Sequence, residues 1–294
     1  MGDAFGERFF VSNDIVDHLI ENRAIPRGDW RLEGDEHPVW LFTDDTMMAL
    51  SVYASLREFG EINQDWLAKD FADRYSPDRG YGPAMHQYLA SIRNGAKWQR
   101  QASELFGGSG SFGNGAAMRV APIGAYFFDD MHAVIAQAQR SAEVTHAHPE
   151  GIAGAVAIAA AVALACQLRE SGTIVRGCEF VDMVLPHVPD SVVLQGVMRA
   201  KALPRGCSVQ LAVSALGNGS RVTAQDTVPF TLWNAARSLD NYEEALWSTL
   251  SGLGDRDTTC AIVGGIVAGY VGTGGIPKEW MAHREPLPEW AVGV

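Results

Sequence analysis

Cysteine is scarce in this sequence, and the cysteines present show no pairing pattern. Cys166, Cys178, Cys207 and Cys260 form no CxxC pair and no zinc-ligand spacing. Such usage is typical of reduced thiols in the cytosol and excludes a disulfide-stapled scaffold. The opening residues MGDAFGERFF also lack the basic start and long apolar core of a signal peptide. We therefore expect a cytoplasmic protein.

Positive charge is also in short supply. The chain has 23 Lys and Arg against 35 Asp and Glu, for a formal net charge of -12. A negative field of this kind repels a phosphate backbone and gives no long-range attraction to anionic lipid. We expect no general nucleic-acid binding and no membrane partner, so an anionic ligand must be held by local contacts.

Alternation of apolar and polar residues, the mark of a half-buried strand, is rare. Only RFFVSN (8–13) and PVWLFT (38–43) show it, whereas 129–144 and 241–251 have helical spacing. No repeat of fixed period and no low-complexity linker interrupts the 294 residues. A mainly α fold is favoured over an α/β fold.

One apolar run is long enough to imitate a membrane span. Residues 151–168, GIAGAVAIAAAVALACQL, are mostly alanine and only weakly apolar. Alanine is the best helix former, and its small side chain lets neighbouring helices approach closely. The run therefore predicts a buried helix in a helical protein.

Two pairs of acids stand directly before apolar helical stretches. Asp44 and Asp45 lie in TDDT (43–46), and Asp255 with Asp257 precede TTCAIVGGIVAGY. At a helix N-terminus the dipole favours negative charge, and one Asp or Thr can cap the free N–H groups. A second carboxylate adds repulsion unless a cation or a proton is shared.

A divalent cation would remove that repulsion. Four carboxylates with the hydroxyls of Thr43 and Thr258 make an all-oxygen set, which suits Mg²⁺, Mn²⁺ or Ca²⁺ better than zinc. The alternative is a pair of ordinary acidic caps. The residues alone leave both readings open.

A glycine-rich stretch, GGSGSFGNG, can be read in more than one way. Gly108, Gly110 and Gly113 form a G-x-G-x-x-G, with Asp129 and Asp130 about 20 residues on, as in a dinucleotide fingerprint. The preceding KWQRQASELF is polar and helical where that fingerprint needs a buried strand. The stretch can instead offer backbone N–H groups to a phosphate, or be a tight turn that needs positive φ.

Two histidines follow in EVTHAHPEG. His146 and His148 could form half of a zinc site, but no matching Cys or His pair occurs. Histidine at a helix end is often structural. We favour substrate contact for His146.

Taken in order, these stretches resemble the ADP-ribosylglycohydrolase family over essentially the whole chain. The resemblance is carried by GDAFG (2–6), TDDT (43–46), FGNGAAMRVAPIG (112–124), THAHP (145–149), GDRDTTCAIVGGIVAGYVG (254–272) and IPKEW (276–280).

This resemblance implies an all-α, compact single-domain orthogonal bundle spanning 1–294, with a centre of two Mg²⁺ or Mn²⁺ ions. Its activity would be metal-dependent hydrolysis of an ADP-ribosyl glycosidic linkage, with ADP-ribose or an ADP-ribosylated acceptor as the partner and the chain a monomer. The implied metal ligands are Thr43, Asp44, Asp45, Asp255, Asp257 and Thr258. The implied substrate-binding residues are Ser111, Phe112, Gly113, Asn114 and His146.

One position departs from the family pattern. Many members carry a Glu shortly after the GDA motif, where this sequence has Phe10. Glu7, one helical turn earlier, could reach the same face, so we predict Glu7, Asp44 and Asp45 as catalytic residues. The alternatives are a solvent-facing Glu7, a catalytically impaired ADP-ribose-binding protein, and a nicotinamide-dependent oxidoreductase.

Overall fold

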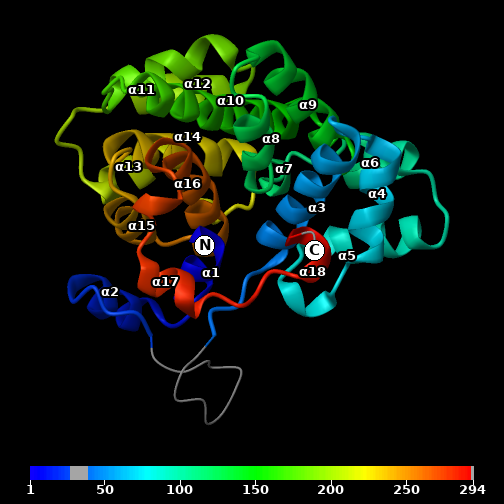
Figure 1. The fold of residues 1–294 in the computed structure, drawn as a ribbon, viewed down its shortest axis with the longest axis horizontal. Coiled ribbons are helices and arrows are strands. Elements are labelled where there is room, and N and C mark those ends of the chain that lie inside the picture. Colours follow the sequence, from blue (N-terminus) through cyan, green and yellow to red (C-terminus); the bar gives the residue numbers. More distant parts are fainter. Residues whose placement is uncertain (27–38, 293–294) are drawn as a thin grey trace.

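The computed structural model describes residues 1–26 and 39–292, and the regular secondary structure of those residues is helical (Figure 1). They contain no β-strand, so the all-α prediction is confirmed. The run 8–13 leads from the end of the first helix into the start of the second, and in the described part of 38–43 Trp40 makes one isolated bridge with Arg284.

The α-helices are α1 (Gly2–Glu7), α2 (Asn13–Glu21), α3 (Asp44–Phe59), α4 (Gln64–Asp73), α5 (Pro83–Arg93), α6 (Trp98–Gly108), α7 (Gly115–Met118), α8 (Ala121–Tyr126), α9 (Met131–Glu143), α10 (Pro149–Ser171), α11 (Cys178–Val184), α12 (Val192–Ala202), α13 (Val209–Leu216), α14 (Ala224–Arg237), α15 (Tyr242–Leu250), α16 (Arg256–Val271), α17 (Lys278–His283) and α18 (Glu289–Val292). Three 3₁₀ turns complete the described elements, η1 (Pro77–Arg79), η2 (Leu185–His187) and η3 (Thr273–Gly275).

The alanine-rich run forms the centre of the molecule. Helix α10 begins at Pro149 after an N-cap at His148 and ends at Gly172, whose φ of 66° suits glycine. It is long and apolar enough to cross a membrane, with a mean hydropathy of 2.1, but 89% of its most apolar window is buried inside the protein. The predicted buried helix over 151–168 is confirmed.

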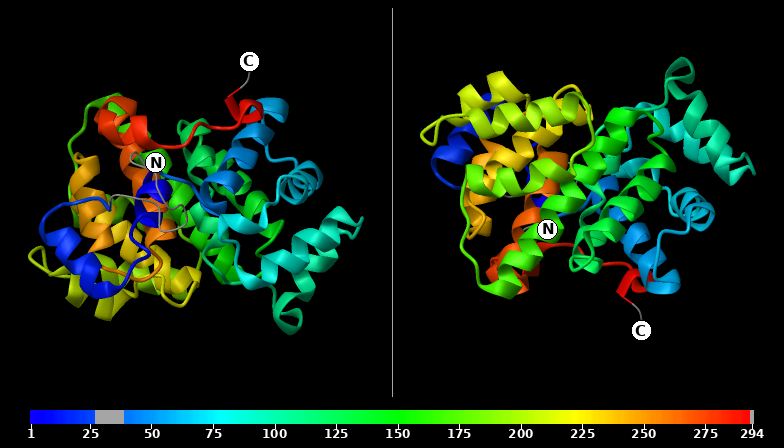
Figure 2. Two further views of the ribbon diagram at one scale, coloured as in Figure 1. Left: turned by 90° about the horizontal axis from the view of Figure 1, so that it is seen from below. Right: turned by 90° about the horizontal axis from the view of Figure 1, so that it is seen from above.

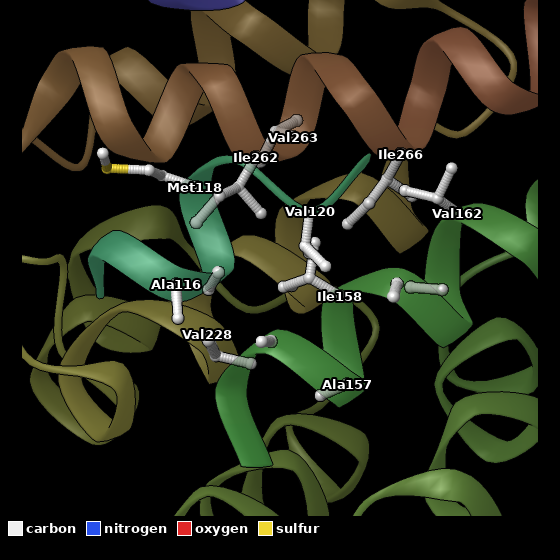
Figure 3. Close-up of a cluster of buried hydrophobic side chains, with 14 of the residues drawn as sticks. Ala116, Met118, Val120, Ala157, Ile158, Val162, Val228, Ile262, Val263 and Ile266 are labelled. Atoms are coloured by element: carbon white, nitrogen blue, oxygen red, sulfur yellow. The ribbon is translucent and has the colours of Figure 1, made fainter. Parts of the chain in front are cut away.

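Helices α7, α10, α14 and α16 share one apolar core. Figure 3 shows Ile158 from α10 and Ile262 from α16 pointing toward one another, with Ala116 of α7 nearby. Val228 of α14 belongs to the same cluster. Burial of apolar surface at about 25 cal/mol per Å² is the main favourable term here, and it fixes the start of α16 relative to the loop before α7.

Helix α1 lies against the first turns of α16, although the two are about 250 residues apart in sequence. A Cβ added to Gly2 would stand 2.0 Å from the carbonyl oxygen of Cys260, and one on Gly6 would stand 2.2 Å from that of Arg256. Only glycine permits this approach. The spacing of the two glycines therefore explains the GDAFG stretch and places Asp3 beside the start of α16.

Seen from above or below, α3 to α6 lie on one side of the molecule and α11 to α16 on the other, with α7 to α10 between them (Figure 2). The C-terminal segment crosses from α17 to the α3 side. There the Arg57 guanidinium donates to the carbonyl oxygens of Trp290 and Ala291, at 3.0 and 3.2 Å. The first turns of α3 and α16, which carry the paired acids, thus come from opposite sides of the fold.

Candidate metal centre and ligand cleft

Helices α3 and α16 begin at the same place. The Thr43 hydroxyl caps α3 by accepting from the Asp45 backbone N–H at 3.3 Å. One carboxylate oxygen of Asp45, Oδ2, lies 3.1 Å from the Thr43 hydroxyl and 3.4 Å from the Thr258 hydroxyl in the first turn of α16. The fold therefore brings both predicted acidic motifs together.

Asp3 belongs to the same cluster, and the sequence interpretation did not include it. It accepts from the backbone N–H groups of Thr43 and Thr46, at 3.0 and 3.1 Å, and from both hydroxyls. Asp3, Asp45 and Asp257 each place a carboxylate oxygen within 4.8 Å of the others. The signal that could have found it is the acid inside GDAFG, between two glycines that press α1 onto α16.

Two oxygens of the cluster have no hydrogen-bond partner among the described residues. They are Oδ1 of Asp45 and Oδ1 of Asp257, both shielded from solvent. A buried acceptor left unpaired costs about 1–3 kcal/mol, and more if it is charged. Because every nearby ligand atom is oxygen, the cluster fits a hard divalent cation, which would satisfy both atoms.

Burial and mutual repulsion perturb the acids strongly. Burial, with a smaller contribution from Asp3, raises the pKa of Asp44 to about 8. Burial also raises the pKa of Asp45 and of Asp257 well above the usual value. Repulsion from Asp257 adds to the effect on Asp45, and repulsion from Asp255 adds to the effect on Asp257. An ordinary exposed cap does not behave in this way, because solvent stabilises its charge.

A cleft of about 660 Å³ opens above the acids, a volume within the usual range for small-molecule sites. Asp44, Asp255, Asp257 and Thr258 line it, and Asp45 lies next to Thr43 and Thr258. The glycine-rich loop and His146 line the same cleft. Leu105, Phe106, Arg221 and Val222 lie among the remaining lining residues.

The glycine-rich loop is anchored to the acids and to a second segment. Phe112 accepts from the Ala224 N–H at 2.9 Å, while the Asn114 N–H donates to the Val222 carbonyl at 3.3 Å. The Asn114 side-chain amide donates to Oδ2 of Asp255 at 2.7 Å. Ser111 accepts the Gly113 N–H through its hydroxyl at 3.2 Å. The four predicted loop residues are thus brought to the cleft beside the acids.

The glycines of this loop answer two different needs. Gly108 and Gly110 have φ of 89° and 73°, the left-handed region that favours glycine. The φ of Gly113 lies outside that region, but a Cβ at Gly113 would stand 3.1 Å from Nε2 of His146. The dinucleotide-binding alternative is wrong, because the residues before the loop form helix α6 and no strand.

The two histidines do not act as a pair. His148 caps α10 by accepting from the Glu150 N–H at 3.1 Å, which is a structural role. His146 is buried on the wall of the cleft, with Nδ1 2.7 Å from the Thr145 hydroxyl. Burial, with a smaller effect of Arg119, lowers the pKa of His146 to about 3, so its ring is neutral at physiological pH.

The ADP-ribosylglycohydrolase family model matches this chain over residues 1–292. The chain belongs to the ADP-ribosylglycohydrolase family. It is 30% identical to ADP-ribosylhydrolase ARH3 of Homo sapiens, over 98% of this chain and 87% of the relative. The Xenopus tropicalis protein of the same name is 32% identical, over 97% and 88%. A solved ADP-ribosylglycohydrolase-related protein complex, 22% identical over 97% of this chain and 88% of that one, has the same fold with a TM-score of 0.56.

With the family shown, Phe10 remains the departure from its pattern. Phe10 is 39% exposed, and the Arg256 guanidinium lies 5.5 Å from its ring centroid. Glu7 is buried in the last turn of α1, so the solvent-facing alternative is wrong. Neither residue is among the described residues that line the cleft. A catalytic role for Glu7 stays a prediction.

Proposed function

We propose that this member of the family hydrolyses an ADP-ribosyl glycosidic linkage in the cleft, with two Mg²⁺ or Mn²⁺ ions held by the acids. The observation that carries the proposal is the pair of unpaired oxygens, on Asp45 and Asp257, beneath a glycine loop that Asn114 ties to Asp255. A site for a cation and a site for a phosphate therefore adjoin. The name of the two relatives, ADP-ribosylhydrolase, supports the substrate class.

The residues that would hold the cations are those predicted from the two motifs. When bound, the ions would lower the pKa of a water molecule and orient the sugar hydroxyls. The cation ligands would be Thr43, Asp44, Asp45, Asp255, Asp257 and Thr258. Asp3 uses both of its oxygens in hydrogen bonds to Thr43 and Thr46, so we assign it the role of orienting the start of α3.

The loop residues would bind the rest of the ligand. The backbone at Gly113 has no side chain and can approach a diphosphate closely. The Phe112 ring is 38% exposed at the cleft and offers an apolar face to a base or sugar. The His146 ring is neutral and lies behind Gly113 and Gly115, where it can contact the same diphosphate.

Cleavage at the anomeric carbon develops positive charge on the ribose ring. The carboxylates of Asp44 and Asp255 line the cleft and would stabilise that charge. In metal-free protein, burial raises the pKa of Asp44 and Asp45, and cations held by these residues would displace their protons. A carboxylate beside the reacting water is suited to proton transfer, a contribution of about 10²- to 10⁴-fold.

A second candidate function is binding of ADP-ribose with little catalysis. It is favoured by Phe10, which stands where many members have a metal-contacting Glu and lies outside the cleft lining. Both candidates need the loop, but only the hydrolase needs turnover. For either function we propose a cytoplasmic monomer.

Incubation with a panel of ADP-ribosylated acceptors distinguishes the hydrolase from the binding protein. The panel contains arginine-linked and serine-linked peptides, an ADP-ribosylated nucleic-acid end and a small ADP-ribose ester. Release of ADP-ribose from at least one acceptor, in Mg²⁺ or Mn²⁺ and suppressed by chelator, is the expected result. Binding of free ADP-ribose without release from any acceptor would favour the binding protein, and absence of both would contradict the proposal.

A further inference from the structure

Arg119 is a buried cation near the acids of the cleft. Its side chain is fully buried at the end of α7, and it makes no ion pair with any described residue. The guanidinium donates to the carbonyl oxygens of Gly115 and Ser141, at 3.2 and 2.7 Å, and lies 4.8 Å from the Phe71 ring centroid. Burying a charge that has no ion pair is costly, so its retention calls for a function.

A further hydrogen bond of Arg119 leads to the ligand cleft. Its Nη2 donates to the Thr145 hydroxyl at 2.9 Å, and that hydroxyl lies 2.7 Å from Nδ1 of His146. A guanidinium has donors only, so the Thr145 oxygen must accept from it. Among the described residues the Thr145 hydroxyl has no acceptor other than Nδ1 of His146, so its hydrogen is directed there. An unprotonated Nδ1 in a neutral imidazole leaves the ring hydrogen on Nε2.

The other ring nitrogen faces the loop. Nε2 of His146 lies 3.1 Å and 3.2 Å from the positions that a Cβ would occupy on Gly113 and Gly115. Both glycines and His146 line the cleft. The missing Cβ atoms therefore leave a short path from the Nε2–H donor toward the space where the loop would hold a phosphate.

We infer that Arg119 and Thr145 are positioning residues, which fix His146 as an Nε2–H donor for the diphosphate of the ligand. The buried guanidinium also supplies positive charge behind the loop, in a protein whose net charge of -12 repels anions. The identity of the ligand rests on the proposed function. The state of the imidazole does not, because it follows from hydrogen bonds within the protein.

The ring state can be measured without any ligand. In protein with ¹⁵N-labelled histidine, we expect the shifts of His146 to show a hydrogen on Nε2 and none on Nδ1. Thr145→Ser should keep this state because it keeps the hydroxyl. Thr145→Val should convert it to a mixture of the two tautomers. Wild-type protein with the hydrogen on Nδ1, or a Thr145→Val spectrum identical to wild type, would overturn the inference.

The effect on binding is measured by calorimetry with free ADP-ribose. Thr145→Val should weaken binding about tenfold, the usual effect of losing one well-aligned hydrogen bond, and Thr145→Ser should stay within about twofold. Mn²⁺ affinity should be unchanged in both. Thr173→Val, at an exposed threonine remote from the cleft, is the control for loss of a hydroxyl and should bind as wild type.

The two experiments fail in different ways. Weaker binding in Thr145→Val with an unchanged ring spectrum would overturn the positioning role. If wild-type protein shows the Nε2–H form but binds no ADP-ribose, the proposed function and the phosphate contact both fall, while positioning of the ring by Thr145 stands. Arg119→Lys gives a further check, since a lysine that still donates to Thr145 should preserve the ring state.

Discussion

At the scale of single residues, the informative atoms are those that lack a partner. Oδ1 of Asp45 and Oδ1 of Asp257 are buried acceptors in a cluster that also contains Asp3. A protein that retained such acids only as caps would leave repulsion and unpaired oxygens without compensation. The cluster therefore supports the proposed cation site, and on that proposal it is costly to the fold when no cation is bound.

This cost leads to a prediction for Asp45→Asn and Asp257→Asn. Each change removes one buried acid, together with the cost of keeping it charged or of protonating it, so we expect metal-free protein to unfold at a higher temperature than wild type, or at the same temperature. The stabilisation of wild type by excess Mg²⁺ should disappear in both variants. Thermal unfolding with and without Mg²⁺ measures both effects.

The matched control is Asp14→Asn, in the first turn of α2. Asp14 also lies at a helix start but is exposed. The Asp14→Asn variant should be stabilised by excess Mg²⁺ as much as wild type is. Stabilisation of Asp45→Asn and Asp257→Asn by Mg²⁺ to the same degree as wild type would contradict the assignment of these ligands.

The prediction for Glu7 concerns proton transfer. If Glu7 shuttles a proton, Glu7→Gln should lower turnover by about 10²- to 10⁴-fold while keeping affinity for Mn²⁺ and ADP-ribose, because the amide preserves shape and removes the basic oxygen. Single-turnover kinetics with the best acceptor measures this. Turnover within about twofold of wild type, the range of an inert substitution, would remove Glu7 from the mechanism and leave Asp44 or Asp45 as the base.

At the scale of elements, the loop before α7 needs glycine at position 113 because a side chain there would have no room, and not because of the backbone conformation. Gly113→Ala should weaken ADP-ribose binding by about tenfold or more, because its Cβ would crowd Nε2 of His146 and the Ser111 hydroxyl, at 3.1 and 3.3 Å. Mn²⁺ binding should change little. Calorimetry with each ligand separates the two effects.

Gly206→Ala is the control for this substitution, since a Cβ at Gly206 has no neighbour within 4 Å and its φ is not in the left-handed region. It should bind ADP-ribose as wild type does. Equal ADP-ribose affinity in Gly113→Ala and wild type would place the ligand elsewhere.

Sequence alone predicted elements well where a local pattern fixed them. The alanine-rich run over 151–168 and the helical spacing over 241–251 both correspond to helices, because propensity and periodicity act within a few residues. The residues alone left open whether the two acid pairs share a cation, and the meeting of α3 with α16 was implied by the family resemblance. Asp3 and Arg119 were not found, since their roles depend on packing between segments far apart in the chain.

At the scale of the whole molecule, the raised pKa values predict how stability varies with pH. An acid whose pKa is higher in the folded state than in the unfolded state favours folding when protonated. For Asp44 the folded pKa is about 8 against a usual value of 3.8. The folded protein then binds more protons than the unfolded chain between those values, so metal-free stability should fall as pH rises from about 4 to about 8.

Bound cations should oppose that trend, because they replace the protons. Urea unfolding at pH 5 and pH 8, in chelator and in excess Mg²⁺, measures the free energy of unfolding under each condition. We expect a clear loss between pH 5 and pH 8 in chelator and a smaller loss, or a gain, in Mg²⁺. A metal-free protein that is more stable at pH 8 than at pH 5 would show that these acids are not protonated in the fold.

The central claim is that the starts of α3 and α16 together hold two divalent cations beside an ADP-ribose cleft. Titration of metal-free protein with Mn²⁺, followed by electron paramagnetic resonance of the free ion, tests it most directly. The account predicts two bound Mn²⁺ per chain in wild type, and loss of bound metal in the double variant Asp45→Asn with Asp257→Asn. Wild-type protein that binds no Mn²⁺, or a double variant that binds as much as wild type, would contradict it.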